Sequence, residues 1–132
     1  MRIRYLTKRE ILEIHNIVLE GTDEDKTVLS EGNLELCVEA PSRQIFGLEP
    51  HKDLVDKACC LLLEINRLHP FYAGNKRTAY QATAIMLLNN GYVLRANRRE
   101  AVAVSKYIGF AGRFICHEQA RKWLRKRVRH TH

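Results

Sequence analysis

The feature of this 132-residue chain that most constrains its fold is an apolar repeat over residues 54–68. Apolar side chains recur there in steps of four and three residues, which is the spacing of one face of an α-helix. They are Leu54, Ala58, Leu61, Ile65 and Leu68. Further apolar residues between them widen the stripe, so we expect this helix in the middle of the fold. Pro70 disfavours helical geometry in the residue before it, and the helix should therefore end near His69.

Other periodic segments predict further helices around this one. Thr7 followed by Glu10 forms a capping-box pattern at the start of a first helix. A second long, buried helix is expected over about 75–90. We therefore expect an all-α fold, a compact bundle of about six helices that forms a single domain over residues 1–132. The remaining predicted helices cover about 33–39, 98–108 and 117–129, and extended stretches are expected at 41–50 and 92–95.

Composition places the chain among globular proteins and excludes some classes. Hydrophobic residues make up 45% and charged residues 28% of the sequence, a balance typical of folded domains. No apolar run reaches the roughly 18–20 residues that a membrane-spanning helix needs, and the N-terminus lacks the pattern of a signal peptide. The four cysteines have no zinc-ligand or redox-motif spacing. We therefore expect a cytosolic protein with reduced thiols.

The net charge of +7 is compatible with several partners. It would suit nucleic acid, an acidic protein or a triphosphate. Much of it lies near the C-terminus, where six basic residues follow Glu118: Arg121, Lys122, Arg125, Lys126, Arg127 and Arg129. A nucleic-acid-binding helix is one interpretation of this cluster. A solvated helix face beside a core stripe is the favoured one.

The segment His69–Thr78, with the sequence HPFYAGNKRT, lies between the two most apolar helices. A helix N-terminus offers unpaired N–H groups to an anion, and Gly74 has no Cβ to keep an anion away. Lys76 and Arg77 place two cations where the helix dipole opposes them, at about 0.3–1 kcal/mol each unless an anion is present. A polyphosphate satisfies these groups best. A neutral imidazole at His69 could then take a proton from an attacking hydroxyl.

Spacing alone also allows a simpler interpretation, in which these residues only connect two helices. The other histidine of interest, His15, lies near the apolar face of the first helix. We predict that it is a packed, hydrogen-bonded core residue and neither a ligand nor a catalyst.

The segment resembles the signature of the Fic/Doc family, His-x-Phe-x-(Asp/Glu)-(Gly/Ala)-Asn-(Lys/Gly)-Arg, and the flanking stretches resemble the helices of that family. The resemblance implies a compact helical bundle with a small β-hairpin flap, for which residues 41–48 are the candidate. It also implies transfer of AMP or a phosphoryl group from ATP to a Ser, Thr or Tyr hydroxyl of a target protein. His69 falls on the catalytic base and Phe71 on the buried anchor of the loop. The phosphate-binding positions fall on Gly74, Asn75, Lys76, Arg77 and Thr78.

The sequence departs in two ways from what this family usually has. Ala73 stands where the family has the acid that holds Mg²⁺, and alanine offers no oxygen to a hard cation. Either Mg²⁺ comes with the nucleotide, or another carboxylate reaches in, or the chain is a weak or inactive binding protein. Lys76 replaces a glycine of the AMP-transferring branch, and Tyr80 stands where that branch has an arginine. The Asn-Lys-Arg-Thr form resembles the Doc branch, so phosphoryl transfer is favoured over AMP transfer.

The Doc branch implies a toxin that phosphorylates a translation elongation factor and is inhibited by a separate antitoxin protein. Residues 27–32 (TVLSEG) also match the loose pattern by which some Fic proteins inhibit themselves, with Glu31 as the inhibiting acid. Tyr80 removes the arginine that such an acid would pair with. We therefore favour inhibition by an antitoxin over self-inhibition.

Overall fold

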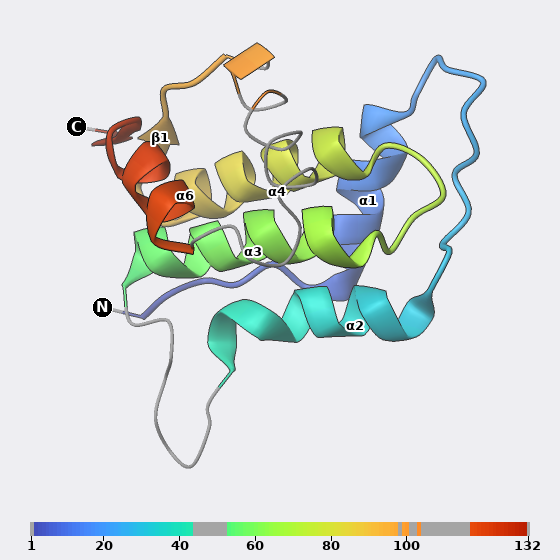
Figure 1. Cartoon of the computed structure of the whole chain (residues 1–132), viewed down its shortest axis with the longest axis horizontal. Helices are drawn as coiled ribbons and strands as arrows, with labels where there is room; N and C mark the ends of the chain where they lie inside the picture. Colours follow the sequence, from blue (N-terminus) through green and yellow to red (C-terminus); the bar gives the residue numbers. More distant parts are fainter. Residues whose placement is uncertain (1, 44–52, 98, 101–102, 104–116, 132) are drawn as a thin grey trace.

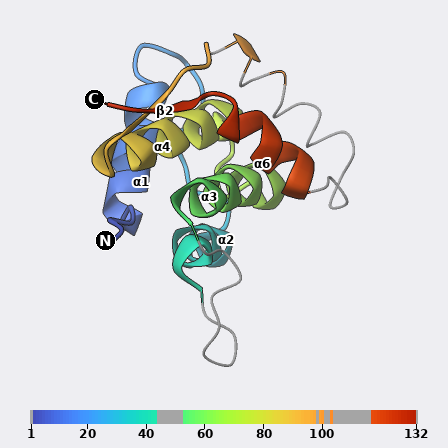
Figure 2. The ribbon, with the colours of Figure 1, turned by 90° about the vertical axis from the view of Figure 1, so that its left-hand side faces the viewer.

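The helix predicted from the apolar repeat is the centre of the molecule. A computed structural model describes residues 2–43, 53–97, 99–100, 103 and 117–131. Ten of the fifteen residues of α3 (Leu54–Leu68) are buried. Figures 1 and 2 show α3 between α2 (Glu31–Glu39) on one side and α4 (Asn75–Asn89) on the other. The prediction of a central helix at 54–68 is confirmed.

The N-terminal helix α1 (Lys8–Val18) packs against α4 and α2. Its start follows the predicted capping box, because the Thr7 side chain accepts from the Glu10 N–H and the Glu10 side chain accepts from the Thr7 N–H. The short helix α2 is capped by Ser30 and continues into a single 3₁₀ turn, η1 (Ala40–Ser42). That turn takes up the beginning of the segment expected to form a hairpin flap.

The C-terminal part of the chain differs from the prediction. We expected a helix over 117–129, but α6 (His117–Arg125) ends earlier, and β2 (Val128–His130) pairs antiparallel with β1 (Tyr92–Leu94). The register joins Tyr92 to His130 and Leu94 to Val128. A β-branched residue suits such a strand better than a helix end, and the neighbouring β1 supplies a backbone partner. The fold is thus mostly helical with one small two-stranded sheet.

Two predicted elements fall largely outside the described residues. They are the part of the flap beyond residue 43 and most of the helix at 98–108. In the part of the chain that is described, no helix is both long and apolar enough to cross a membrane. Cys37, Cys59 and Cys60 are buried free thiols, and burial raises the pKa of each to about 12. They are therefore protonated, inert core residues.

The basic residues of α6 have structural partners. Arg125 pairs with Asp53 at 2.5 Å, and Arg121 reaches Asp56 at 3.4 Å. Both carboxylates lie at the start of α3, so these pairs join α6 to the central helix. This structural use favours the simpler interpretation of the basic cluster over nucleic-acid binding.

Candidate functional site

His69 ends α3 in an unusual backbone conformation. Its φ of 47° places it in the left-handed region, where it stands alone among the described residues other than glycine. This conformation ends the helix in the manner of a C-terminal cap, and the following proline prevents further helical turns. The side chain is exposed. The His69 ring therefore lies at the surface, at the start of the loop that joins α3 to α4.

Asn75 holds that loop closed with its side chain. Its Oδ1 accepts from the Phe71 N–H at 3.1 Å, and its Nδ2 donates to the Phe71 carbonyl at 2.8 Å. The same Nδ2 lies 3.4 Å from Nδ1 of His69, a long contact. Asn75 is only 7% exposed. Its side chain is thus occupied in shaping the loop, and only its backbone N–H remains to meet a ligand.

The start of α4 has the features of an anion site. Gly74 is its N-cap, with φ of 78° and no capping side chain, and the first backbone bond inside the helix is donated by Thr78 to Gly74. The amides of residues 75–77 therefore have no helical acceptor. They adjoin a cavity of about 320 Å³, lined by His69, Tyr72, Ala73, Gly74, Asn75, Lys76 and Arg77.

The structure therefore brings together most of the residues that sequence reasoning grouped. His69 and the run from Gly74 to Arg77 share one cavity. Phe71 is 1% exposed and lies in the core, as expected of a buried anchor. Thr78 is fully buried and does not belong to the cavity lining.

Gly74 has a second reason to be glycine. A Cβ built on it would lie 2.8 Å from Cδ2 of Leu19 and 3.3 Å from its Cγ. Leu19 is fully buried behind the turn. Sequence reasoning assigned Gly74 to anion approach alone, because nothing local indicates that residue 19 packs against residue 74.

Residues 27–30 form backbone hydrogen bonds with the loop that joins α3 to α4. Leu29 and Ser30 donate to the Pro70 carbonyl at 2.8 and 3.2 Å, and Tyr72 donates to the Thr27 carbonyl at 3.2 Å. Asn33 of α2 caps the end of α3 by donating to the Leu68 carbonyl at 2.9 Å. Hydrogen bonds from residues 27–30 and from Asn33 therefore fix both the loop and the end of α3 that leads into it.

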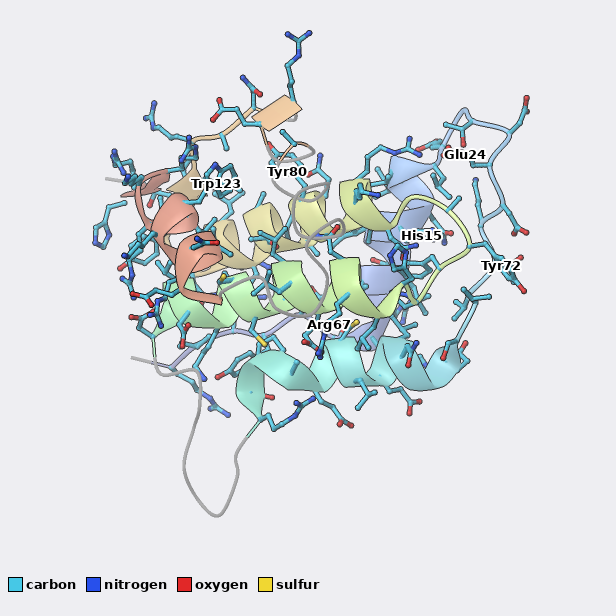
Figure 3. The ribbon with its side chains drawn as sticks, in the orientation of Figure 1. His15, Glu24, Arg67, Tyr72, Tyr80 and Trp123 are labelled. Carbon is cyan, nitrogen blue, oxygen red and sulfur yellow. The ribbon has the colours of Figure 1, made fainter. Side chains whose placement is uncertain are left out.

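Glu24, which sequence reasoning did not single out, forms an ion pair with Arg77. Figure 3 shows Glu24, His15 and Tyr72 at the same end of the molecule, beside the loop between α3 and α4. The acid that the sequence pattern suggested, Glu31, pairs instead with Lys8 at 2.8 Å. The carboxylate that pairs with Arg77 thus lies five residues after Leu19, the C-cap of α1, and outside the matched pattern.

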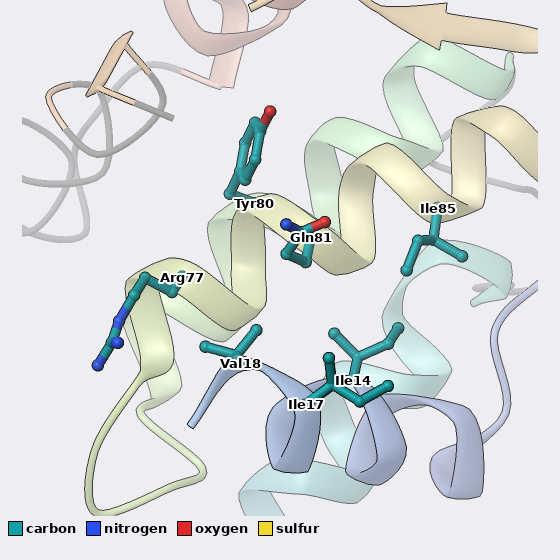
Figure 4. Close-up of a pocket in the computed structure, with 7 residues that line it drawn as sticks. All are labelled: Ile14, Ile17, Val18, Arg77, Tyr80, Gln81 and Ile85. Carbon is teal, nitrogen blue, oxygen red and sulfur yellow. The ribbon is translucent and has the colours of Figure 1, made fainter. Parts of the chain in front are cut away.

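Arg77 also lines a second cavity, which lies between α1 and α4. We call it the α1–α4 groove: about 310 Å³ in volume, lined by Ile14, Ile17, Val18, Arg77, Tyr80, Gln81 and Ile85. Figure 4 shows the apolar side chains of α1 facing α4 across it, with Arg77 at one end. Ile17 is 68% exposed. The site and this partly apolar groove therefore share the residue Arg77.

The described residues do not form a protein-held magnesium site. Ala73 lines the cavity where the family pattern has an acid, and no three His, Cys, Asp or Glu side chains of the described part are grouped for metal binding. The nearby carboxylate of Glu24 forms an ion pair with Arg77. A hard cation prefers several oxygen ligands, and the described residues do not assemble them around this cavity.

Comparison with known proteins identifies the family to which this chain belongs. The Fic/DOC family model matches residues 5–87, which include the whole loop and the start of α4. The chain belongs to that family. It is similar to a protein named Toxin Doc from Mycolicibacterium smegmatis (strain ATCC 700084 / mc(2)155), with 33% identity over 93 residues, or 70% of this chain and 69% of the relative.

Proposed function

We propose that this chain is a Doc-like toxin that transfers a phosphoryl group from ATP to a hydroxyl side chain of a target protein. One observation carries the proposal: His69 lies at the same cavity as the free amides of α4 and the side chains of Lys76 and Arg77. A base beside a phosphate site is the arrangement that such a transfer requires.

The step follows from these groups. The target hydroxyl gives its proton to a neutral His69 ring while its oxygen forms a bond to the γ-phosphorus of ATP. The bond from that phosphorus to the bridging oxygen breaks, and ADP leaves. Lys76, Arg77 and the amides at the start of α4 stabilise the negative charge that the phosphoryl oxygens carry.

Phosphoryl transfer is favoured over AMP transfer by two residues. Lys76 adds a cation where the AMP-transferring branch has glycine. Tyr80 stands where that branch has an arginine, and its hydroxyl donates to the Ala96 carbonyl at 3.0 Å. The second phosphate contact of that branch is therefore lacking at this position.

A second candidate is a binding protein of low or no activity, which Ala73 favours. The substitution Ala73→Asp separates the two. A large gain in transfer rate would mean that the acid was the missing group, and an already active natural chain would exclude the inactive alternative.

We also infer that an antitoxin chain inhibits this protein by docking in the α1–α4 groove. The groove is lined mainly by apolar side chains, and its residue Arg77 also lines the cavity of the site, so a chain docked in the groove would lie beside that cavity. The net charge of +7 suits an acidic partner. We expect Ile17→Asp to abolish capture of the antitoxin and Leu36→Asp, at an exposed position of α2, to preserve it. Equal capture by both variants would contradict this docking site.

The proposed transfer is tested by mass spectrometry of a translating extract incubated with ATP, Mg²⁺ and this protein. A gain of about 80 Da on a translation elongation factor or another target is expected, and about 329 Da would mean AMP transfer instead. His69→Ala should abolish the gain, and His130→Ala, at an exposed position of β2, should preserve it. Absence of any labelled protein would refute the transferase.

A further inference from the structure

His15 contacts the site loop directly, although it lies 58 residues away in the sequence. Its Nε2 is 2.8 Å from the carbonyl oxygen of Ala73. Its ring stacks on Phe71 with centroids 3.7 Å apart and planes 8° apart. The side chain is 1% exposed. It is the packed, hydrogen-bonded histidine that the sequence predicted, but its partner is the backbone of the phosphate turn.

The contact to Ala73 bears on the next amide. In a trans peptide the C=O and N–H groups point in opposite directions within one plane, and the structure has no cis peptide among its described residues. His15 draws the Ala73 oxygen towards α1. The Gly74 N–H of the same peptide is therefore turned away from α1, and both residues line the cavity of the site.

The hydrogen bond from His15 to the Ala73 carbonyl depends on the protonation state of the imidazole ring. A carbonyl oxygen only accepts, so Nε2 of His15 must carry the proton. Burial lowers the pKa of His15 below its ordinary value of 6.5, and the cationic Arg77 and Lys26 lower it further. The ring is thus neutral near pH 7 and adds no charge that would compete with the phosphate-binding cations. The ring also stacks on Phe71 without bringing a permanent charge into the core, as a lysine or arginine donor would.

We propose that His15 is a positioning residue for phosphate binding: by holding the Ala73 carbonyl, it presents the Gly74 N–H to a phosphate oxygen. This inference rests on the proposed phosphoryl-transfer function, since it concerns the anion site of that reaction. It adds a group on α1 that touches neither nucleotide nor target and that acts through a backbone peptide.

The test is a titration of ¹⁵N-labelled protein with pyrophosphate, followed by NMR. In the natural chain we expect His15 to carry its proton on Nε2 and the Gly74 amide to shift on binding. His15→Phe keeps the stacking but has no donor. It should bind pyrophosphate about 5-fold more weakly, the effect of one hydrogen bond of about 1 kcal/mol, with helical circular dichroism retained. His15→Gln offers an amide donor and should recover most of the affinity, while His130→Phe should have no effect.

The outcomes separate this inference from the proposed function. If the natural chain does not bind pyrophosphate, the phosphate site and this inference both fail. If it binds, and His15→Phe binds equally with an unchanged Gly74 amide, only the role of His15 is refuted. If neither variant folds, the tautomer in the natural chain decides, because a proton on Nδ1 would overturn the contact on which the inference rests.

Discussion

Gly74→Ala is the substitution that best tests how the site is built. The alanine would keep φ near 78°, which costs an L-residue about 1–2 kcal/mol. Its Cβ would also lie 2.8 Å from Leu19 Cδ2. Leu19 is fully buried, and overpacking of this kind costs about 1–3 kcal/mol. We therefore expect the free energy of unfolding to fall by about 2–5 kcal/mol.

Gly21→Ala provides a matched control for this prediction. Gly21 has nearly the same φ, 79°, and a Cβ there would meet no atom within 4 Å. The backbone strain is therefore shared, and the overlap with Leu19 is not. Urea unfolding should show that Gly21→Ala loses only about 1–2 kcal/mol. The difference between the two variants measures the packing against Leu19.

A double-mutant cycle with Leu19→Ala makes the attribution specific. Removing the Leu19 side chain opens a cavity and is destabilising by itself, but it also removes the atoms that the new Cβ would meet. We expect Gly74→Ala to cost clearly less in the Leu19→Ala background than in the natural chain. If Gly74→Ala is no more destabilising than Gly21→Ala, or the cycle shows additivity, the packing argument is refuted.

Three further predictions concern charges and hydrogen bonds around the site. Glu24→Gln removes the ion pair with Arg77, and a partly exposed pair of this kind is worth about 0.2–1 kcal/mol. A calorimetric titration should therefore show up to about 5-fold higher affinity for pyrophosphate. The control Glu20→Gln should leave that affinity unchanged. The pKa of His15 is lower in the folded chain than in the unfolded chain, so the unfolded chain binds more protons. The free energy of unfolding, measured in urea, should therefore fall as the pH drops below about 6.5. The fall should be less steep in His15→Phe. Asn75→Ala leaves buried loop groups unpaired and should lower the free energy of unfolding by about 1–3 kcal/mol in urea.

Much of the fold and of the site is encoded locally in the sequence. The 54–68 stripe, the capping box at Thr7 and the proline after His69 each act through neighbours within one or two helical turns, and all three are confirmed. The clustering of His69 with the Gly74–Arg77 run also follows from local connection, because only four residues separate His69 from Gly74 in the sequence. These features are set by periodicity and by short-range hydrogen bonds.

Tertiary structure decided the contacts between distant segments. β2 replaces the end of the predicted helix because β1, more than thirty residues earlier, supplies its pairing partner. Glu24 and not Glu31 reaches Arg77, and His15 finds its acceptor on Ala73. No local pattern carries this information, since each of these contacts joins segments that are far apart in the sequence. Packing also decides that Leu19 fills the space behind Gly74 at the start of α4.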